Sequence, residues 1–447
     1  MVTSINRTLS RRLFLKSIGV GATSLALAAC IAPQAGESGA APATATTELD
    51  VLVCCYAPPD LEVRNKVNSE FEQANGGIKL NQELLPGGQN YFEKLQTLIA
   101  GNTPPDVFDM WEGYVQPYAK NGALLNLDPL LETDPKVKKE NLLPIAVDGA
   151  SWDNHLYALM LGFIPGPVSL YYNTAHFEKV GIAAPTSDWK WDDLRNAAKD
   201  LTQDSNSDGE PEQWGAAFDL WFVPWLHWIW SNGGDIFNPE QTACTLSEPA
   251  AVEALQYWAD LVNVDKVAIS PSALASMQGG LSAFQSGLVS MYIGNAWDVG
   301  TLKSNKELQW KAVLTPTANS GKRAWYTHFQ CWAISAQTKA PEKAWSYIRD
   351  FVLNYEPAIQ EIAPTIPSIK ELVPAFDNPT TQELGYQPLL ELVTQPGIMR
   401  IPGAGDRWDK ISGLIQSELD LLFIGEKSAA DAAAAATITV NEELNRA

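Results

Sequence analysis

The hydrophobic pattern of the first part of the chain switches between the period of a strand and the period of a helix. Residues 49–56 form an apolar run typical of a strand covered on both faces, and residues 78–84 alternate as a strand does. Helical spacing of apolar residues covers 63–71 and 92–99, and residues 105–109 are a short strand. This order predicts a parallel sheet with right-handed crossovers, whose ligands would lie beyond the carboxyl ends of the strands.

Residues 161–173 mark a change of direction in the chain. Pro165, Gly166 and Pro167 break any helix and disfavour a central strand, and the apolar residues 168–172 follow as a buried strand. We interpret this stretch as a joint between two α/β lobes, where concave faces meet and ligands bind. The alternative is an ordinary loop inside one large domain.

The later pattern adds further helices and strands and a second passage between the lobes at 326–335. Strands are predicted at 288–293 and 310–314, and amphipathic helices at 194–201, 252–262, 281–286, 344–352, 411–422 and from residue 429. The predicted fold is α/β with two lobes and a hinge. We expect residues 48–162 and 323–372 to form the first lobe, and residues 163–322 and 373–447 to form the second.

The N-terminal residues 1–29 have the features of an export signal. Arg11 and Arg12 precede an apolar run, residues 18–29, that is too short to span a bilayer comfortably, an order that matches a twin-arginine signal. The run ends in small residues before Cys30, which predicts lipidation of that cysteine; a plain signal peptide is the alternative. Residues 30–47 are rich in Ala, Pro, Ser and Thr and predict a flexible stalk. We therefore expect a protein lipid-anchored to the outer face of the cell membrane.

The charge and the cysteines exclude several classes of function. The formal net charge is −21, and residues 1–29 hold basic but no acidic residues, so the remainder is more acidic still. Such a body repels phosphate backbones, which disfavours nucleic acid as a partner. Cys54, Cys55, Cys244 and Cys331 fit neither a zinc site nor a disulfide framework, and we expect buried free thiols rather than one bridge.

Residues 204–215 resemble a calcium-binding loop. Oxygen-bearing side chains alternate before a glycine, in the pattern D-x-N-x-D-G, but Gly215 occupies the twelfth position, where a bidentate acid is expected. A solvated turn is the alternative reading. The candidate ligands of a structural Ca²⁺ are Asp204, Asn206, Asp208, Glu210 and Glu212.

Aromatic residues are abundant and cluster near predicted strand ends. The chain has 16 tryptophans, and residues 220–230 are the densest aromatic segment, of which we expect about half to be core. Indole faces suit the apolar faces of sugar rings, and neighbouring acids and amides suit hydroxyl groups. Asp109 and Trp111 lie at a strand end, and Tyr91 is predicted in a loop before a helix. Together these features predict a carbohydrate ligand.

Several motifs, in order across nearly all of residues 48–447, are similar to those of the extracellular solute-binding proteins of ABC importers, in their carbohydrate-binding branch. They are Pro-Asp-Val-Phe at 105–108, Leu-Tyr-Tyr-Asn at 170–173, and the segments at 152–159, 204–215, 284–297 and 333–345. The resemblance implies a periplasmic-binding-protein-like fold that closes on its ligand. It also implies contacts from Asn295, Trp297, Tyr326 and His328. The family usually has glycines where this chain has residues 328–330.

The predicted function is capture of a sugar or oligosaccharide for delivery to a membrane permease, by a monomer that is not an enzyme. The alternatives are a secreted polysaccharide hydrolase or lyase, with carboxylate pairs as acid and base, or a lectin without a transporter. No nucleophile elbow, metalloprotease motif or phosphate loop occurs. The candidate ligand contacts are Tyr91, Asp109, Trp111, Phe163, Trp221, Trp225, Asp235, Asn295, Trp297, Asp298, Tyr326, His328, Arg400, Asp406 and Trp408.

Overall fold

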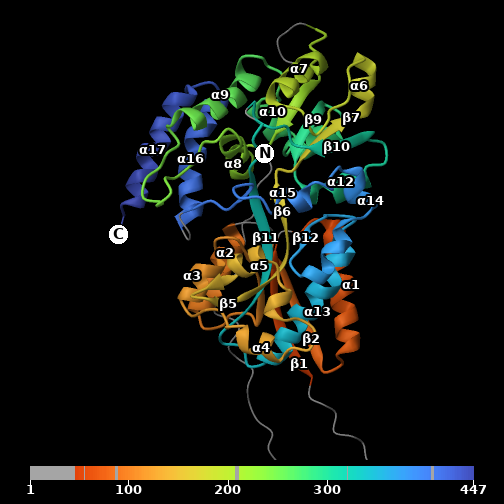
Figure 1. Ribbon diagram of the computed structural model, residues 1–447, viewed down its shortest axis with the longest axis vertical. Coiled ribbons are helices and arrows are strands. Elements are labelled where there is room, and N and C mark those ends of the chain that lie inside the picture. The colour runs from red at the N-terminus through yellow and green to blue at the C-terminus, as the bar shows by residue number, and fades with distance from the viewer. Residues whose placement is uncertain are drawn as a thin grey trace, which may run out of the picture. The chain divides into compact units, whose positions relative to one another are not determined.

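Two β-sheets organise the chain (Figure 1). The computed structural model describes residues 46–54, 56–85, 89–206, 211–319, 321–403 and 407–446. The larger sheet has the strand order β12-β6-β11-β3-β1-β2 with β13 beside β11, the smaller has the order β10-β7-β9-β8, and β4 and β5 form a separate pair. The strands are β1 Thr47–Cys54, β2 Ile78–Leu85, β3 Val107–Trp111, β4 Ser151–Trp152, β5 His155–Leu156, β6 Ala158–Gly166, β7 Ser169–Asn173, β8 Trp214–Phe218, β9 Val289–Gly294, β10 Trp310–Leu314, β11 Trp325–Ile334, β12 Ile366–Pro367 and β13 Met399–Arg400.

The predicted β-α-β-α-β start of the chain is confirmed. β1 pairs in parallel with both β2 and β3, and α1 and α2 make the two connections. Because β11 and β6 then add in antiparallel fashion, the larger sheet is mixed.

Helices flank both sheets. Beside the larger sheet, α1 packs on α13, and α13 contacts β6 and β11 (Figure 1). Beside the smaller sheet, α8, α9, α16 and α17 pack on one another. The helices are α1 Pro58–Ala74, α2 Gln89–Ala100, α3 Val115–Lys120, α4 Asp128–Thr133, α5 Pro144–Gly149, α6 Thr174–Val180, α7 Trp191–Leu201, α8 Phe222–Ser231, α9 Pro249–Asn263, α10 Pro271–Ser276, α11 Gly280–Gln285, α12 Val299–Ser304, α13 Pro341–Ile359, α14 Pro379–Glu383, α15 Leu389–Leu392, α16 Trp408–Phe423 and α17 Ala429–Leu444, with 3₁₀ turns η1 Lys139–Asn141, η2 Ala296–Asp298 and η3 Lys370–Phe376. None of the described helices is long and apolar enough to cross a bilayer.

Pro165 and Gly166 were predicted to disfavour a central strand, but β6 continues through both residues. β6 pairs with β11 as far as Gly166, whereas β12 pairs only with Phe163 and Gly162. At Pro165 the strand therefore has a neighbour on one side only, which is where a sheet can hold a residue without an N–H. The chain leaves the larger sheet directly after this point, through a cis Gly166–Pro167 bond, and enters β7 of the smaller sheet.

The second passage between the sheets lies just before residues 326–335, where it was predicted. β10 ends at Leu314 in the smaller sheet, and β11 begins at Trp325 in the larger one, so residues 326–335 are mostly strand. The lobe boundaries after residues 162, 322 and 372 stay predictions. The sheets themselves change between residues 166 and 169 and between 314 and 325.

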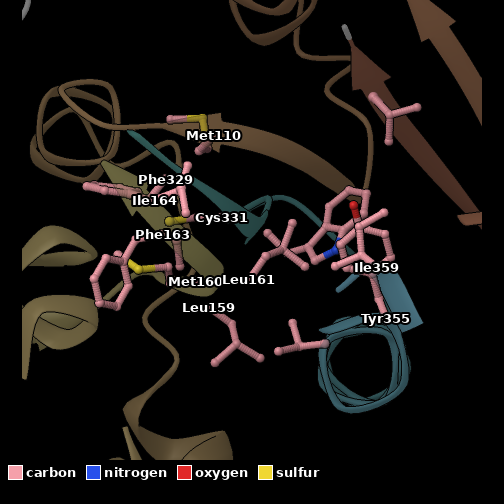
Figure 2. Packing of buried hydrophobic residues seen from close by; sticks show 14 of the residues in the cluster. Met110, Leu159, Met160, Leu161, Phe163, Ile164, Phe329, Cys331, Tyr355 and Ile359 are labelled. Atoms are coloured by element: carbon pink, nitrogen blue, oxygen red, sulfur yellow. The ribbon is translucent and has the colours of Figure 1, made fainter. Parts of the chain in front are cut away.

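Two clusters of buried apolar side chains hold the fold together. One surrounds the larger sheet and includes the side chains between β6, β11 and α13 that Figure 2 shows. The other joins one face of the smaller sheet to α7, α8, α9, α16 and α17. Cys331 lies in the first cluster and Cys244 in the second, and both are free thiols as expected, whereas Cys54 is disulfide-bonded.

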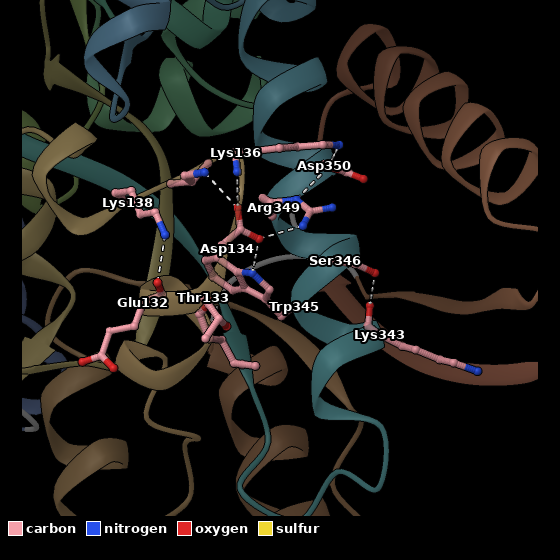
Figure 3. A network of polar contacts seen from close by, with 12 residues as sticks. Glu132, Thr133, Asp134, Lys136, Lys138, Lys343, Trp345, Ser346, Arg349 and Asp350 are labelled. Carbon is pink, nitrogen blue, oxygen red and sulfur yellow. Dashed lines mark hydrogen bonds and ion pairs between the residues drawn. The ribbon is translucent and has the colours of Figure 1, made fainter.

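A buried ion pair ties the loop after α4 to α13 (Figure 3). Asp134 accepts hydrogen bonds from Arg349 Nη1 at 2.7 Å, from Trp345 Nε1 at 2.8 Å and from the backbone of Lys136 and Val137. Burial alone would raise the pKa of Asp134, but Arg349 and these donors outweigh it and lower that pKa.

Candidate functional site

A small pocket lies where four segments of the chain meet. They are the turn after β3, the start of β11, the residues after β13 and the start of α16, and the lining residues are Glu112, Gly113, Tyr114, Tyr326, Ile401, Pro402, Trp408 and Asp409. The pocket's volume of about 30 Å³ is well below the roughly 300 Å³ or more of a typical ligand pocket. A ligand the size of a sugar therefore requires these segments to separate.

Glu112 is the centre of the polar contacts around this pocket. The residue is 8% exposed. Its carboxylate accepts a hydrogen bond from the Tyr326 hydroxyl, lies 3.0 Å from His328 Nδ1, and accepts the Phe329 N–H at 2.9 Å. The sequence analysis missed this residue, although it directly follows Asp109 and Trp111 of the strand end that was singled out.

Aromatic rings surround His328. The centroid of the imidazole lies 5.2 Å from that of Trp297, 6.3 Å from that of Trp111 and 6.4 Å from that of Tyr326. The ring centroid of Phe222 in α8 lies 5.4 Å from that of Tyr326 and 5.8 Å from that of Trp408. The rings thus come from β3 and β11 of the larger sheet and from α8, η2 and α16 beside the smaller one. We call Trp111, Glu112, Tyr114, Trp297, Tyr326, His328, Trp408 and Asp409 the Glu112 cluster.

A hydrogen bond between a tyrosine and a carboxylate joins the two sides of the cluster, the side that follows β3 and the side formed by α16. The Tyr114 hydroxyl donates to Asp409 of α16, and the Tyr114 ring stacks on Phe92 with centroids 3.6 Å apart. Burial and the Asp409 carboxylate raise the pKa of Tyr114 above its ordinary value, so the phenol keeps its proton and remains a donor.

Two further predicted contacts, Asn295 and Asp298, lie at the end of β9 and support Trp297 between them. Asp298 is 5% exposed, and its Oδ2 accepts the Asn295 N–H at 2.8 Å and approaches the Tyr292 hydroxyl at 3.3 Å. Burial raises the pKa of Asp298 to about 7, and the nearby Asp219 carboxylate adds to the effect. Asp298 thus shapes the turn that carries Trp297.

Gly166 packs closely against η2 and α8. A Cβ there would lie 3.1 Å from Asn295 Oδ1 and 3.2 Å from Val223 Cγ1, so a larger residue would require these side chains to shift. Among the described residues, Asn295 Oδ1 has no hydrogen-bond partner although it is buried.

Tyr91 and Asp109 were predicted as ligand contacts, and both are fully buried instead. Tyr91 lies in the first turn of α2 rather than in a loop, and its hydroxyl donates to the carbonyl of Asp109 at 2.8 Å. Asp109 accepts from Tyr56 and from the Cys54 N–H, next to Arg64. Burial raises the pKa of Asp109 to about 6, against the lowering effect of Arg64. Tyr91 and Asp109 thus lie in the core of the larger sheet, where Asp109 Oδ1 has no hydrogen-bond partner among the described residues.

Four other candidates have partners within the protein, two in the interior and two in a partly exposed ion pair. Phe163 is buried in β6, and Trp225 is fully buried in α8, where its Nε1 donates to Gln416. Asp235 and Arg400 form an ion pair, and the Arg400 guanidinium lies 4.6 Å from the centroid of Trp230. Paired in this way, they satisfy each other's charge.

The remaining candidates lie at the surface or outside the described residues. Trp221 is 36% exposed, next to Phe222. Asp406, and Asp208 and Glu210 of the calcium-like loop, lie outside the described residues. In that loop Glu212 accepts hydrogen bonds from the backbone and side chain of Ser205, at 2.8 and 2.9 Å. The described residues contain no cluster of three or more His, Cys, Asp or Glu side chains that could hold a metal ion.

Comparison with known proteins finds a single family across most of the chain. The sequence model of the bacterial extracellular solute-binding proteins matches residues 59–357. An ABC substrate-binding protein of Listeria monocytogenes, solved in complex with cycloalternan, is 26% identical with a TM-score of 0.78, covering 90% of this chain and 100% of its own.

Two curated relatives are also similar. The maltotriose-binding protein of Pyrococcus abyssi is 22% identical over 81% of this chain and 75% of its own. The diacetylchitobiose-binding protein of Streptomyces coelicolor is 24% identical over 69% of this chain and 71% of its own.

Proposed function

Because the chain belongs to the family of bacterial extracellular solute-binding proteins, we propose that it captures a sugar or oligosaccharide between two lobes and delivers it to the permease of an ABC importer. The observation that carries the proposal is the Glu112 cluster. It combines indole and phenol rings with two carboxylates, and it draws them from elements of both sheets. Sugars present apolar ring faces together with hydroxyl donors, and this set of side chains matches both.

The physical mechanism needs no chemical step. The pocket encloses only about 30 Å³, so a sugar has to enter while the two sides of the cluster are apart. A ligand that contacts both sides binds the closed form better than the open form and shifts the population toward closure. The closed form is then the one that the permease recognises.

We propose a receptor rather than an enzyme. The two carboxylates of the pocket, Glu112 and Asp409, each accept a hydrogen bond from a tyrosine, which suits a fixed binding surface more than a proton-transferring pair. Incubation of the purified protein with maltotriose, cellotriose and chitin oligosaccharides, followed by chromatography of the sugars, tests this. Appearance of shortened products would favour the hydrolase or lyase.

The location and assembly of the protein are part of the same proposal. The paired arginines at 11 and 12 and the small residues before Cys30 support twin-arginine export and lipid anchoring on the outer face of the membrane. In a bacterial host, Cys30→Ala should release the protein from the membrane fraction into the soluble one. Light scattering of the processed protein should give the mass of a monomer, as expected for a lobe-closing receptor.

A structural Ca²⁺ at residues 204–212 remains a proposal that rests on the spacing of the oxygen ligands. Calorimetric titration of EDTA-treated protein with Ca²⁺ tests it. A signal that Asp204→Asn removes would support the site, and no heat of binding would exclude it.

A thermal-shift screen against neutral mono- and oligosaccharides, followed by calorimetry and small-angle scattering on each hit, tests the main proposal. We expect stoichiometric binding and a smaller radius of gyration with ligand. A protein that binds none of the sugars, or that binds one without compaction, would contradict it.

A further inference from the structure

Glu112 and His328 form a pair whose geometry assigns the hydrogen-bonding role of each imidazole nitrogen. Three groups converge on the Glu112 carboxylate: the Tyr326 hydroxyl, the Phe329 N–H and His328 Nδ1. An ionised carboxylate can only accept hydrogen bonds, so Nδ1 must carry a proton and donate it across the 3.0 Å contact. The tautomer follows from this partner, as it does for metal-bound and catalytic histidines.

The other nitrogen is consequently the one that can face a ligand. In a neutral imidazole protonated at Nδ1, Nε2 holds a lone pair and accepts a hydrogen bond. Among the described residues, Nε2 of His328 has no hydrogen-bond partner, and the side chain is 26% exposed while that of Glu112 is 5% exposed. The pair therefore has a buried end that is fully engaged and an outer end that is open.

The surroundings of that outer end suit a ring-shaped, uncharged guest. The indoles of Trp111 and Trp297 both meet the imidazole edge-on, each with an interplanar angle of 67°. His328 contacts Glu112 and Tyr326, which also line the adjacent small pocket, and the lining of that pocket includes the carboxylates of Glu112 and Asp409 but no Lys or Arg. A ligand that carries a carboxylate or phosphate would meet two negative charges without a partner cation.

We propose that His328, oriented by Glu112, determines the specificity of the site by accepting one hydroxyl hydrogen bond of a neutral sugar at Nε2. This inference rests on the proposed function and adds to it a substrate class, neutral rather than acidic saccharides. It also adds two roles: His328 touches the ligand, and Glu112 is a positioning residue that acts through His328.

Two substitutions of His328 distinguish the roles of its two ring nitrogens. His328→Asn keeps an N–H donor near the position of Nδ1, so it can still pair with Glu112, but it has nothing at the position of Nε2. His328→Gln places its amide near the position of Nε2 and offers an acceptor there. For maltotriose, or for the first neutral sugar that the screen returns, we expect His328→Asn to weaken binding about tenfold and His328→Gln to stay within about threefold of the unmodified protein.

A matched control makes the same substitution in a similar pair elsewhere. His155 in β5 also has Nδ1 bonded to a carboxylate, that of Asp128, at 2.8 Å, and its side chain is 51% exposed. His155→Asn should leave sugar affinity unchanged. Melting temperatures of all variants verify that each one is folded.

A double-mutant cycle tests the positioning role of Glu112. Glu112→Gln should weaken binding in the unmodified protein, because the amide cannot accept from all three donors, but should have little further effect in His328→Asn. An equal loss in both backgrounds would show that Glu112 does not act through His328. Should Glu112→Gln fail to fold, the comparison of the two His328 variants still decides the role of Nε2.

The outcomes distinguish this inference from the proposed function. If the unmodified protein binds sugar and His328→Asn binds it equally well, the role of His328 is refuted while the receptor function stands. The same holds if His328→Gln is as weak as His328→Asn, or if glucuronic and galacturonic acid oligomers bind as tightly as neutral ones. If the unmodified protein binds no sugar, the proposed function fails and this inference fails with it.

Discussion

Asp298 should make the protein less stable as the pH rises through neutrality. Its carboxyl is 5% exposed and lies near the Asp219 carboxylate, and its pKa is raised from 3.8 to about 7. Between these two values the folded state holds a proton that the unfolded state has lost, so the stabilisation is complete below about pH 4 and is lost as the pH rises through about 7. The full shift corresponds to about 4 kcal/mol, and the part that falls between pH 5 and pH 8 to about 2–3 kcal/mol.

The substitution Asp298→Asn isolates this contribution. The amide oxygen can still accept the Asn295 N–H, and no charge develops beside Asp219 at any pH. We expect the free energy of unfolding of the variant, relative to the unmodified protein, to rise by about 2–3 kcal/mol between pH 5 and pH 8.

Urea unfolding followed by tryptophan fluorescence at both pH values measures this difference. Asp153→Asn is the control, because Asp153 is exposed in the turn between β4 and β5 at a φ of 49°, which Asn also tolerates. An Asp298→Asn effect of the same size at pH 5 and pH 8 would refute the reasoning.

Three further substitutions test other parts of the structure. Asp134→Asn should lower the free energy of unfolding by about 2 kcal/mol, because Arg349 loses its charged hydrogen bond to Asp134 and keeps only the ion pair with Asp350. Urea titration against the exposed-site control Asp153→Asn measures this. Tyr114→Phe removes the bond to Asp409 and should increase the radius of gyration of the sugar-free protein in small-angle scattering; an unchanged radius would mean that this bond does not hold the two sides together. Trp297→Ala should weaken calorimetric binding of the screened sugar about tenfold without lowering the melting temperature by more than a few degrees, and undiminished affinity would place the ligand away from this indole.

Periodicity alone predicted most of the elements, because their apolar faces are regular. The helix predicted from the spacing of residues 63–71 spans Pro58–Ala74, and the strands on either side of it pair in parallel as expected. Pro165 was misjudged because a strand tolerates proline where it has a neighbouring strand on one side only. The second neighbour of β6 is β12, which begins two hundred residues later in the chain and does not reach Pro165.

The site was predicted in part, for a related reason. Trp297, Tyr326, His328, Trp111 and Trp408 do gather in one place, yet side-chain type could not separate them from Trp225 or Tyr91, whose partners are in the core. Glu112 was overlooked because its role is set by Tyr326 and His328, which lie more than two hundred positions away in the chain. A charged residue immediately beyond a buried strand end was the one local signal.

The pocket takes its side chains from the turn after β3, the beginning of β11, the residues after β13 and the beginning of α16. A truncated or partly folded polypeptide would contain only some of these groups in place and would not bind sugar. Retention on an immobilised saccharide resin would thus report completion of the whole fold, and could serve as a selection for variants that mature correctly.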